Sequence, residues 1–163
     1  MRVGLGFDIH RLVSGRPLLL GGVQIPYEKG LLGHSDGDAL LHAMIDALLG
    51  AAGQGDIGDW FSDQDPANRG RDSSEMAKLV LRQIQQSGFQ IDYFDTINFA
   101  EAPKIAPIKQ SIRQKLSQIF EIEIQAINLK AKTMEKLGPI GQGEAIAAQA
   151  IVLLRQEKLS LSV

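Results

Sequence analysis

The segment from about Asp36 to Ala51 predicts a helix that is apolar on almost every side. Its polar side chains Asp38, His42 and Asp46 recur every fourth residue, so they form one line along the helix. The positions between them are apolar: Leu40, Leu41, Ala43, Met44, Ile45, Ala47, Leu48 and Leu49. Such a helix is buried on most sides, and its polar line is expected to face an internal site or an interface. Ser35 is the predicted N-cap of this helix and Gly53 its end.

Other segments supply strands and two further helices. Arg2–His10 and the apolar run Pro17–Ile25, which follows a Ser14-Gly15 turn, predict a β-hairpin or two neighbouring strands. The remaining predicted strands are 90–100 and 125–133, and the remaining helices are 72–88, after the Asp72-Ser-Ser-Glu75 capping signature, and 107–119, opened by Pro107. Segment 145–154 fits either state, because its alanines favour a helix and its Ile-Val pair favours a strand. This order predicts an α+β fold, a mixed sheet with helices packed on one face.

The composition describes an ordinary globular protein. A length of 163 residues predicts one domain covering the whole chain. The absence of cysteine excludes disulfides, thiolate metal clusters and a cysteine nucleophile, so a metal must be bound by His, Asp or Glu. A net charge of −2 without a basic run argues against nucleic-acid binding. No apolar stretch is long enough for a membrane span, and no signal peptide is recognised, so we expect a cytoplasmic protein.

Three side chains from two segments form a candidate metal site. In an extended strand, Asp8 and His10 point to the same face, about 6.6 Å apart along the strand. With His42 they supply one carboxylate and two imidazoles, a set that suits zinc or manganese and leaves a fourth position open for substrate. Asp46, one turn beyond His42, is expected to orient its imidazole.

Other motifs carry less information. Asp-x-His alone is a weak signal, and a single helical histidine is more often structural. Gly4-Leu-Gly6 lacks the third glycine of a dinucleotide site, and Asp63-x-Asp65 lacks the other ligands of a calcium loop. Residues 53–72 read as one long loop of the kind that forms lids or binding loops.

The three candidate ligands stand beside several further motifs. These are His34-Ser-Asp-Gly-Asp38, Gly55-Asp-Ile-Gly58 and Thr133-Met-Glu-Lys-Leu-Gly138. Together, over essentially the whole chain, they closely resemble the 2-C-methyl-D-erythritol 2,4-cyclodiphosphate synthase family. The resemblance implies a homotrimer of an α+β fold around a central three-fold axis, with active sites between subunits, acting in the non-mevalonate route to isoprenoids. The implied substrate is 4-diphosphocytidyl-2-C-methyl-D-erythritol 2-phosphate, whose 2-phosphate attacks the β-phosphorus so that CMP leaves and the cyclic diphosphate forms.

The resemblance also implies roles for individual residues. Asp8, His10 and His42 would hold the zinc-type ion, and Glu135 would hold a second cation, magnesium or manganese, that bridges the diphosphate. His34 and Thr133 would stabilise the transition state, and Ser35 would add a helix N-terminus directed at phosphate. Asp38 and Asp46 would support the metal ligands from behind.

Substrate contacts follow from the same resemblance. Asp56, Ile57 and Gly58, with Phe61, Ser62, Asp63, Gln64 and Asp65, would surround the erythritol. Ala100, Pro103, Lys104, Ile105 and Ala106, with Lys132, Thr133, Met134 and Glu135, would form the cytidine and phosphate pocket that the adjacent subunit supplies. Pro139 and Gln142 are two further candidate substrate-binding residues. Lys104 and Lys132 could equally be solvated surface lysines.

Three positions depart from the pattern of similar proteins. Ser62 stands where many have Pro, Gln142 where Arg is frequent and Gln149 where Glu is frequent. The first is expected to loosen the loop, and the other two alter only what binds near the trimer axis. Two other functions use the same ligands: hydrolysis of a phosphoester by a metal-bound water, and diphosphate binding by a non-catalytic trimer with a structural ion.

Overall fold

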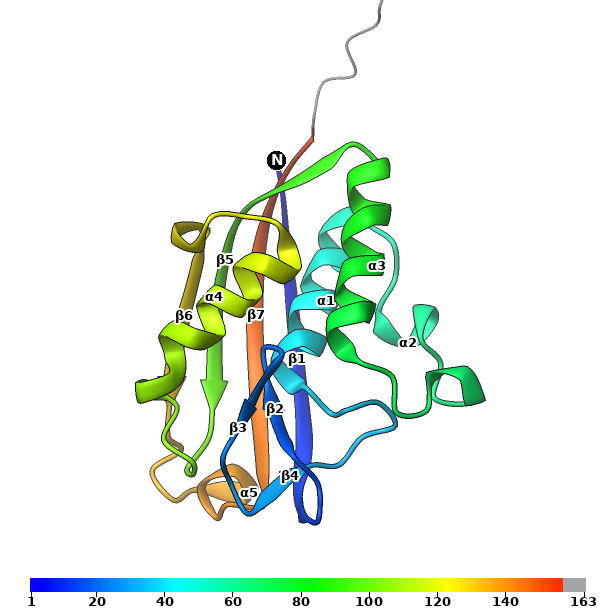
Figure 1. Cartoon of the computed structure of the whole chain (residues 1–163). Coiled ribbons are helices and arrows are strands. Elements are labelled where there is room, and N and C mark those ends of the chain that lie inside the picture. The colour runs from blue at the N-terminus through cyan, green and yellow to red at the C-terminus, as the bar shows by residue number, and fades with distance from the viewer. Residues whose placement is uncertain (157–163) are drawn as a thin grey trace, which may run out of the picture.

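The computed structural model describes residues 1–156 as a sheet covered on one face by helices (Figure 1). Five strands form the main sheet in the order β4-β1-β7-β5-β6. Their bounds are Arg2–Ser14 (β1), Lys29–Leu31 (β4), Phe89–Phe99 (β5), Ile127–Lys132 (β6) and Ala145–Gln156 (β7). The sheet is mixed, because β6 runs parallel to β5 while the other pairs are antiparallel. The predicted α+β class and mixed sheet are therefore confirmed.

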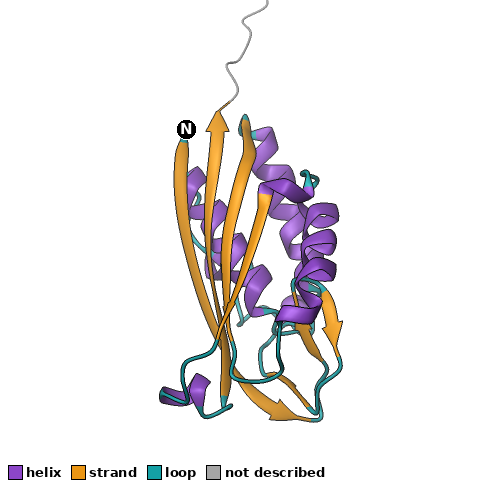
Figure 2. Cartoon of the chain, turned by 90° about the vertical axis from the view of Figure 1, so that its left-hand side faces the viewer, coloured by secondary structure: helices purple, strands orange, loops and turns teal. Residues whose placement is uncertain are grey.

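Three long helices lie on the same side of this sheet (Figure 2). They are α1 (Ala39–Ala52), α3 (Ser73–Gln86) and α4 (Lys109–Phe120). Helix α1 packs on β1 and β7, and α3 packs against α1. Twelve of the fourteen residues of α1 are buried, as its apolar sequence predicts. The longest of these helices have 14 residues, and none among residues 1–156 could span a membrane.

The predicted hairpin between residues 2–10 and 17–25 is wrong in its pairing. Strand β1 pairs with β4 and β7, whereas β2 (Leu18–Leu20) and β3 (Val23–Ile25) pair with each other. Gly21 and Gly22 form the two-residue turn between them, with φ of 61° and 74°. Turns with positive φ at both central residues join antiparallel strands without splaying them, and glycine adopts this conformation without a Cβ clash. The pair of glycines explains why this short hairpin closes on itself.

Segment 145–154, whose sequence fits either a helix or a strand, forms strand β7 in the middle of the sheet. Residues 53–72 contain two short helical turns, α2 (Ile57–Trp60) and a 3₁₀ turn (Pro66–Asn68). Further 3₁₀ turns at Ala106–Ile108 and Ile124–Ala126 precede α4 and β6. Helix α5 (Gly138–Gly141) precedes β7.

The face of the sheet opposite the helices carries exposed apolar side chains, mainly from β1. Alternate residues of β1 point to it: Val3, Leu5, Phe7 and Ile9, which are between 67% and 46% exposed. Ile151 of β7 and Tyr93 of β5 are exposed as well. In the single chain, the long helices lie on the other side of the sheet (Figure 2).

Candidate metal centre

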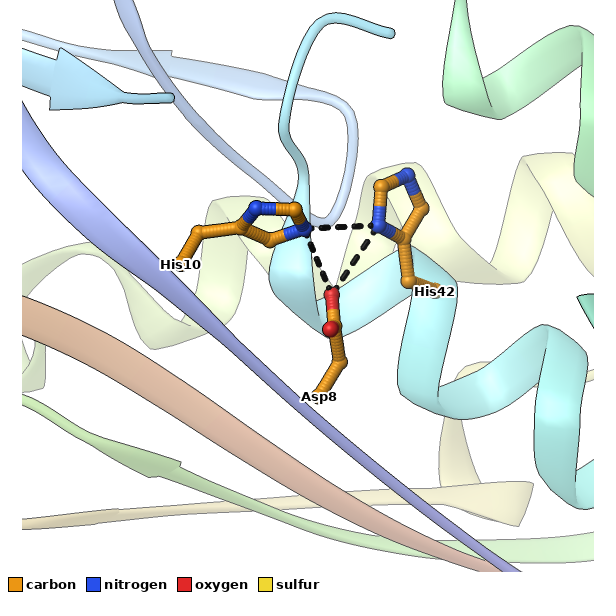
Figure 3. Close-up of side chains that lie close together, drawn as sticks. All are labelled: Asp8, His10 and His42. Atoms are coloured by element: carbon orange, nitrogen blue, oxygen red, sulfur yellow. Dashed lines mark hydrogen bonds and ion pairs between the residues drawn. The ribbon is translucent and has the colours of Figure 1, made fainter. Parts of the chain in front are cut away.

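The candidate ligands converge from a strand and a helix (Figure 3). Asp8 and His10 lie two residues apart on β1, and His42 lies in the first turns of α1, which packs across that strand. One carboxylate oxygen, Asp8 Oδ2, lies 2.8 Å from His10 Nε2 and 2.9 Å from His42 Nδ1. The two imidazole nitrogens are 3.1 Å apart. The cluster that the sequence predicts is therefore assembled, and it is able to bind a metal ion.

The tautomer of His10 supports this interpretation. Its Nδ1 lies 2.7 Å from the backbone oxygen of Leu32. A carbonyl only accepts hydrogen bonds, so Nδ1 carries the proton and Nε2 presents a lone pair to the other two donor atoms. Lone pairs that converge this closely need a proton or a cation between them. Ligand atoms around a tetrahedral zinc ion with bonds of about 2.0–2.1 Å lie about 3.3 Å apart, within about 0.5 Å of the separations here. The donor set fits a divalent metal.

The electrostatics of the cluster agree with its geometry. Burial would raise the pKa of Asp8, but hydrogen bonds with His10 and His42, in which a proton takes the place of the ion, outweigh it and hold that pKa well below its usual range. Burial would lower the pKa of His10, but the hydrogen bond and charge of Asp8 outweigh it and raise the pKa. The lowered pKa keeps the Asp8 carboxylate ionised, and the raised pKa of His10 reflects the attraction of positive charge to that carboxylate.

A cavity of about 390 Å³ opens beside the three ligands. It is lined by Asp8, His10, His34, Ser35, His42, Asp46, Ile57, Gly58, Phe61, Ser62, Asp63, Asn68 and Met76. A second cavity, of about 580 Å³, shares His34, Ser35 and Asp63 and adds Arg16, Gln64, Asp65 and Arg69 among its lining residues. The structure thus brings most of the predicted erythritol-binding residues to the metal ligands. Asp56 lies beside them as the N-cap of α2, accepting from Asp59 N.

Two expectations about the start of helix α1 are wrong: that Ser35 is its N-cap, and that Asp38 supports a metal ligand. The N-cap is Asp38 and not Ser35, because the Asp38 carboxylate accepts from Leu41 N and α1 begins at Ala39. Ser35 instead accepts from Gly37 N and lies 3.1 Å from His42 Nε2. Asp38 also accepts from the backbone N–H groups of Gly21 and Gly22, so it anchors the β2–β3 turn and not a metal ligand.

Asp46 does not orient His42. Its carboxylate accepts from Ile57 N at 2.8 Å, which ties α2 to α1 beside the cavity. Burial raises the pKa of Asp46, more than this hydrogen bond lowers it, and the charge of Asp56 raises it further. The oxygen atoms that His42 Nε2 contacts belong to Ser35 and to Ser73, the latter at 2.9 Å. In the sequence, Ser73 belongs only to a helix-capping signature, which does not predict its place beside His42.

The remaining predicted residues form a second group at the ends of β5 and β6. Ala100 N donates to Lys132 O at 3.0 Å, and Met134 N donates to Glu101 Oε2 at 3.3 Å, which joins segment 100–106 to segment 132–135. Thr133 Oγ1 donates to Glu135 Oε1 at 2.9 Å. Pro139 lies in α5, and Gln142 ends it. Two strands separate β6 from β1, so β6 lies roughly 14 Å across the sheet. Within one chain these residues line neither cavity.

The fold and site together define a class of protein: an α+β protein with an open cavity beside one aspartate and two histidines that are able to bind a metal ion. The model of the YgbB family matches residues 1–155, and the chain belongs to this family. It is 51% identical over 154 residues to the 2-C-methyl-D-erythritol 2,4-cyclodiphosphate synthase of Synechococcus sp. (strain JA-2-3B'a(2-13)), covering 94% of this chain and 98% of that protein. It is 52% identical over 155 residues to the protein of the same name from Geobacillus kaustophilus (strain HTA426), covering 95% and 98%.

Solved structures agree with the sequence relatives. A 2C-methyl-D-erythritol-2,4-cyclodiphosphate synthase in its CDP-bound form superposes with a TM-score of 0.87 at 39% identity, covering 94% of this chain and all of that one. The bifunctional IspDF of Campylobacter jejuni superposes with a TM-score of 0.93 at 39% identity. There the match covers 96% of this chain but only 42% of the bifunctional protein.

Proposed function

We propose that this protein is a 2-C-methyl-D-erythritol 2,4-cyclodiphosphate synthase. It converts 4-diphosphocytidyl-2-C-methyl-D-erythritol 2-phosphate into the cyclic diphosphate and CMP, in the non-mevalonate route to isoprenoids. The observation that carries this proposal is the convergence of Asp8, His10 and His42 beside the cavity, in a chain about half identical to proteins of that name over nearly their full length. We also propose that one catalytic domain spans the chain and that the protein is cytoplasmic.

The chemistry is a phosphoryl transfer within one molecule. An oxygen of the 2-phosphate forms a bond to the β-phosphorus, and the bond from the β-phosphorus to the oxygen shared with the α-phosphorus breaks, so CMP leaves with that oxygen. The nucleophile belongs to the substrate, so the protein has to position the groups and offset their charge. A zinc or manganese ion held by Asp8, His10 and His42 would supply positive charge against the repulsion between the phosphate groups.

The residues around the cavity have different roles in positioning the substrate and offsetting its charge. His34 and Ser35 act where the 2-phosphate and the diphosphate meet, a role supported by their position in the lining of both cavities. Ile57 and Gly58, with Phe61 to Asp65, enclose the erythritol, and Asp56 and Asp63 accept hydrogen bonds from its hydroxyl groups. Ala100 to Ala106, with Lys132, Thr133 and Met134, hold the cytidine and phosphates. Glu135 would hold a second cation, magnesium or manganese, which would supply further positive charge to the diphosphate.

We propose a homotrimer whose active sites lie between subunits. Two observations support it. The bare apolar row Val3, Leu5, Phe7 and Ile9 is the kind of surface that a partner subunit covers. The residues proposed for cytidine and for the second cation lie about 14 Å across the sheet from the metal ligands, so one chain lacks half of the site. A second copy with its 100–106 and 132–135 segments beside the cavity would complete it.

Phosphorus NMR of the purified protein with the cytidyl substrate, zinc and magnesium tests the proposal. A synthase yields the cyclic diphosphate and CMP, whereas a phosphoester hydrolase releases inorganic phosphate and a binding protein changes nothing. His42→Ala is the matched inactive control, because it removes one ligand. Inorganic phosphate, or no reaction in the presence of both metals, would contradict the proposal.

A further inference from the structure

The His42 imidazole faces the metal ligands with one nitrogen and a buried serine with the other. Its Nδ1 lies beside Asp8 Oδ2, and its Nε2 lies 2.9 Å from Ser73 Oγ. Ser73 is fully buried, and it is the first residue of α3. The first residue of α3 thus contacts a candidate metal ligand, His42, through its hydroxyl group.

The Ser73 hydroxyl is held by a carboxylate. Its Oγ donates to Asp36 Oδ1 in a short hydrogen bond, and the backbone N–H of Ser73 donates to Asp36 Oδ2 at 3.0 Å. Both oxygens of Asp36 therefore bind the same residue. The backbone N–H of Asp36 donates to Arg71 O at 3.1 Å, which fixes the carboxylate further against the start of α3.

The direction of these hydrogen bonds determines the proton position on His42. A carboxylate only accepts, so the single hydroxyl proton of Ser73 is directed to Asp36. The Ser73 oxygen is then free to accept, and the group that donates to it is His42 Nε2–H. An imidazole that carries its proton on Nε2 presents a lone pair on Nδ1. That lone pair points to Asp8 and His10, where the metal ion would bind.

Ser35 is compatible with the same arrangement. Its Oγ, 3.1 Å from His42 Nε2, accepts from Gly37 N and can accept from His42 with its other lone pair. Ser73 differs from Ser35 because a charged group fixes its hydroxyl proton. In His10, the Leu32 carbonyl fixes the ring in the same way by accepting from Nδ1, but this acceptor is neutral.

We infer that Asp36 and Ser73 are positioning residues for the metal centre, acting on His42 and touching neither metal nor substrate. They hold the His42 ring at one angle, with Nε2 directed at the Ser73 oxygen and Nδ1 directed at Asp8 and His10. Partners of this kind, behind a metal-binding histidine, typically change metal affinity ten- to a hundredfold when they are removed. The inference rests on the proposed function only for the presence of the metal.

Zinc competition with a chelating dye tests the inference without any assay of turnover. Ser73→Ala removes the hydroxyl and should lower zinc affinity ten- to a hundredfold. Asp36→Asn keeps the shape of the side chain and allows an amide to face the hydroxyl, so it should lower the affinity by a smaller factor. Ser74→Ala is the matched control, because it makes the same change one residue later in α3, where the side chain does not contact His42. It should bind zinc within twofold of the unaltered protein.

A spectroscopic readout separates positioning from loss of structure. In zinc-loaded protein labelled with ¹⁵N-histidine, the Nε2 proton of His42 should give a slowly exchanging NMR signal, which Ser73→Ala abolishes while the His10 Nδ1 signal remains. Unchanged zinc affinity in both Ser73→Ala and Asp36→Asn would overturn the inference. Because zinc affinity is measured directly, a failure here is distinct from failure of the synthase activity, which the phosphorus NMR experiment decides.

Discussion

Gly6 of β1 lies directly against the backbone of Ala43 in α1. A Cβ on Gly6 would overlap the Ala43 carbonyl oxygen and lie 2.8 Å from Ala47 N, so the strand and the helix are in backbone contact here. Gly4 makes the same contact one turn further along the helix. Asp8 follows Gly6 on the same face of β1, and His42 precedes Ala43. The close approach of the two elements is therefore what brings the carboxylate within 2.9 Å of the imidazole.

We predict that Gly6→Ala lowers both stability and metal affinity. The added methyl group forces α1 away from β1, at a cost of about 1–3 kcal/mol in the free energy of unfolding, and separates His42 from Asp8 and His10. Chemical denaturation and zinc competition measure the two effects. Gly50→Ala is the control, since a Cβ there meets no atom within 4 Å. It should stabilise the helix by about 0.5–1 kcal/mol, and equal zinc affinity in both variants would refute the packing argument.

The stability of the metal-free protein should depend on pH through Asp8 and His10. The pKa of His10 is raised in the folded state, so its contribution to stability is complete below about pH 6.5 and is lost as the pH rises through the folded-state pKa. The pKa of Asp8 is lowered, so its contribution is complete above about pH 4 and is lost only in stronger acid. The pair therefore stabilises the metal-free fold most between about pH 4 and 6.5.

Thermal unfolding of the metal-free protein and of Asp8→Asn across this range isolates the effect of the pair. The difference in Tm should be largest near pH 5.5 and should shrink toward pH 8.5. Zinc affinity should change in the opposite direction and rise with pH, because the ion displaces protons from the imidazoles. A Tm difference that stays constant from pH 5.5 to 8.5 would exclude the His10 contribution.

Asp46 offers a test of what supports the cavity. Since its carboxylate accepts from Ile57 N, Asp46→Ala should release α2 from α1 and weaken substrate binding, while the metal ligands keep their partners. Loss of a hydrogen bond to a charged group, about 1.5–3 kcal/mol, corresponds to a KM raised about tenfold or more. Asp46→Asn retains an acceptor oxygen and should stay close to the unaltered protein. A fall in zinc affinity in both variants would instead show that Asp46 orients His42.

The metal ligands could be predicted from the sequence because each signal is local. An alternating strand places Asp8 and His10 on one face, and a polar line on an apolar helix marks His42. Ser73 could not be found in this way, since its contact with His42 depends on how α3 packs on α1. A serine at a helix start has the same local pattern whether or not it meets a histidine.

Strand β7 shows that the fold, too, depends on packing that the local sequence does not reveal. Its alanines favour a helix when considered alone, but Ala148 and Ala150 pair with Asp8 and Gly6 of β1 and lie fully buried beneath the helices. Small side chains are needed there because α1 packs closely on the sheet. Tertiary packing thus outweighs the intrinsic preference of alanine, and no window of sequence records that requirement.

Glu135 should affect magnesium and not zinc. It lies in the group at the ends of β5 and β6, where its carboxylate accepts from Thr133 Oγ1, away from Asp8, His10 and His42. We predict that Glu135→Gln binds zinc as tightly as the unaltered protein but needs at least tenfold more magnesium for half-maximal turnover, because a neutral amide is a weaker ligand for a hard cation. Magnesium titrations of both proteins at saturating zinc measure this. An identical magnesium dependence would remove Glu135 from the second cation site.

The last prediction concerns the division of the site between subunits. If the metal ligands of one subunit work with the 132–135 segment of the next, His42→Ala and Thr133→Ala damage opposite halves of each site. Trimers of either variant alone should then be inactive. When the two are unfolded together and refolded as a mixture, a site is intact only where a subunit with normal metal ligands meets a neighbour with a normal Thr133. Random assembly gives this arrangement in about a quarter of the sites. We therefore expect turnover to recover to about one quarter of that of the unaltered protein, whereas variants that are refolded separately and then mixed should stay inactive. No recovery after joint refolding, in a sample that is trimeric by light scattering, would mean that each chain completes its own site.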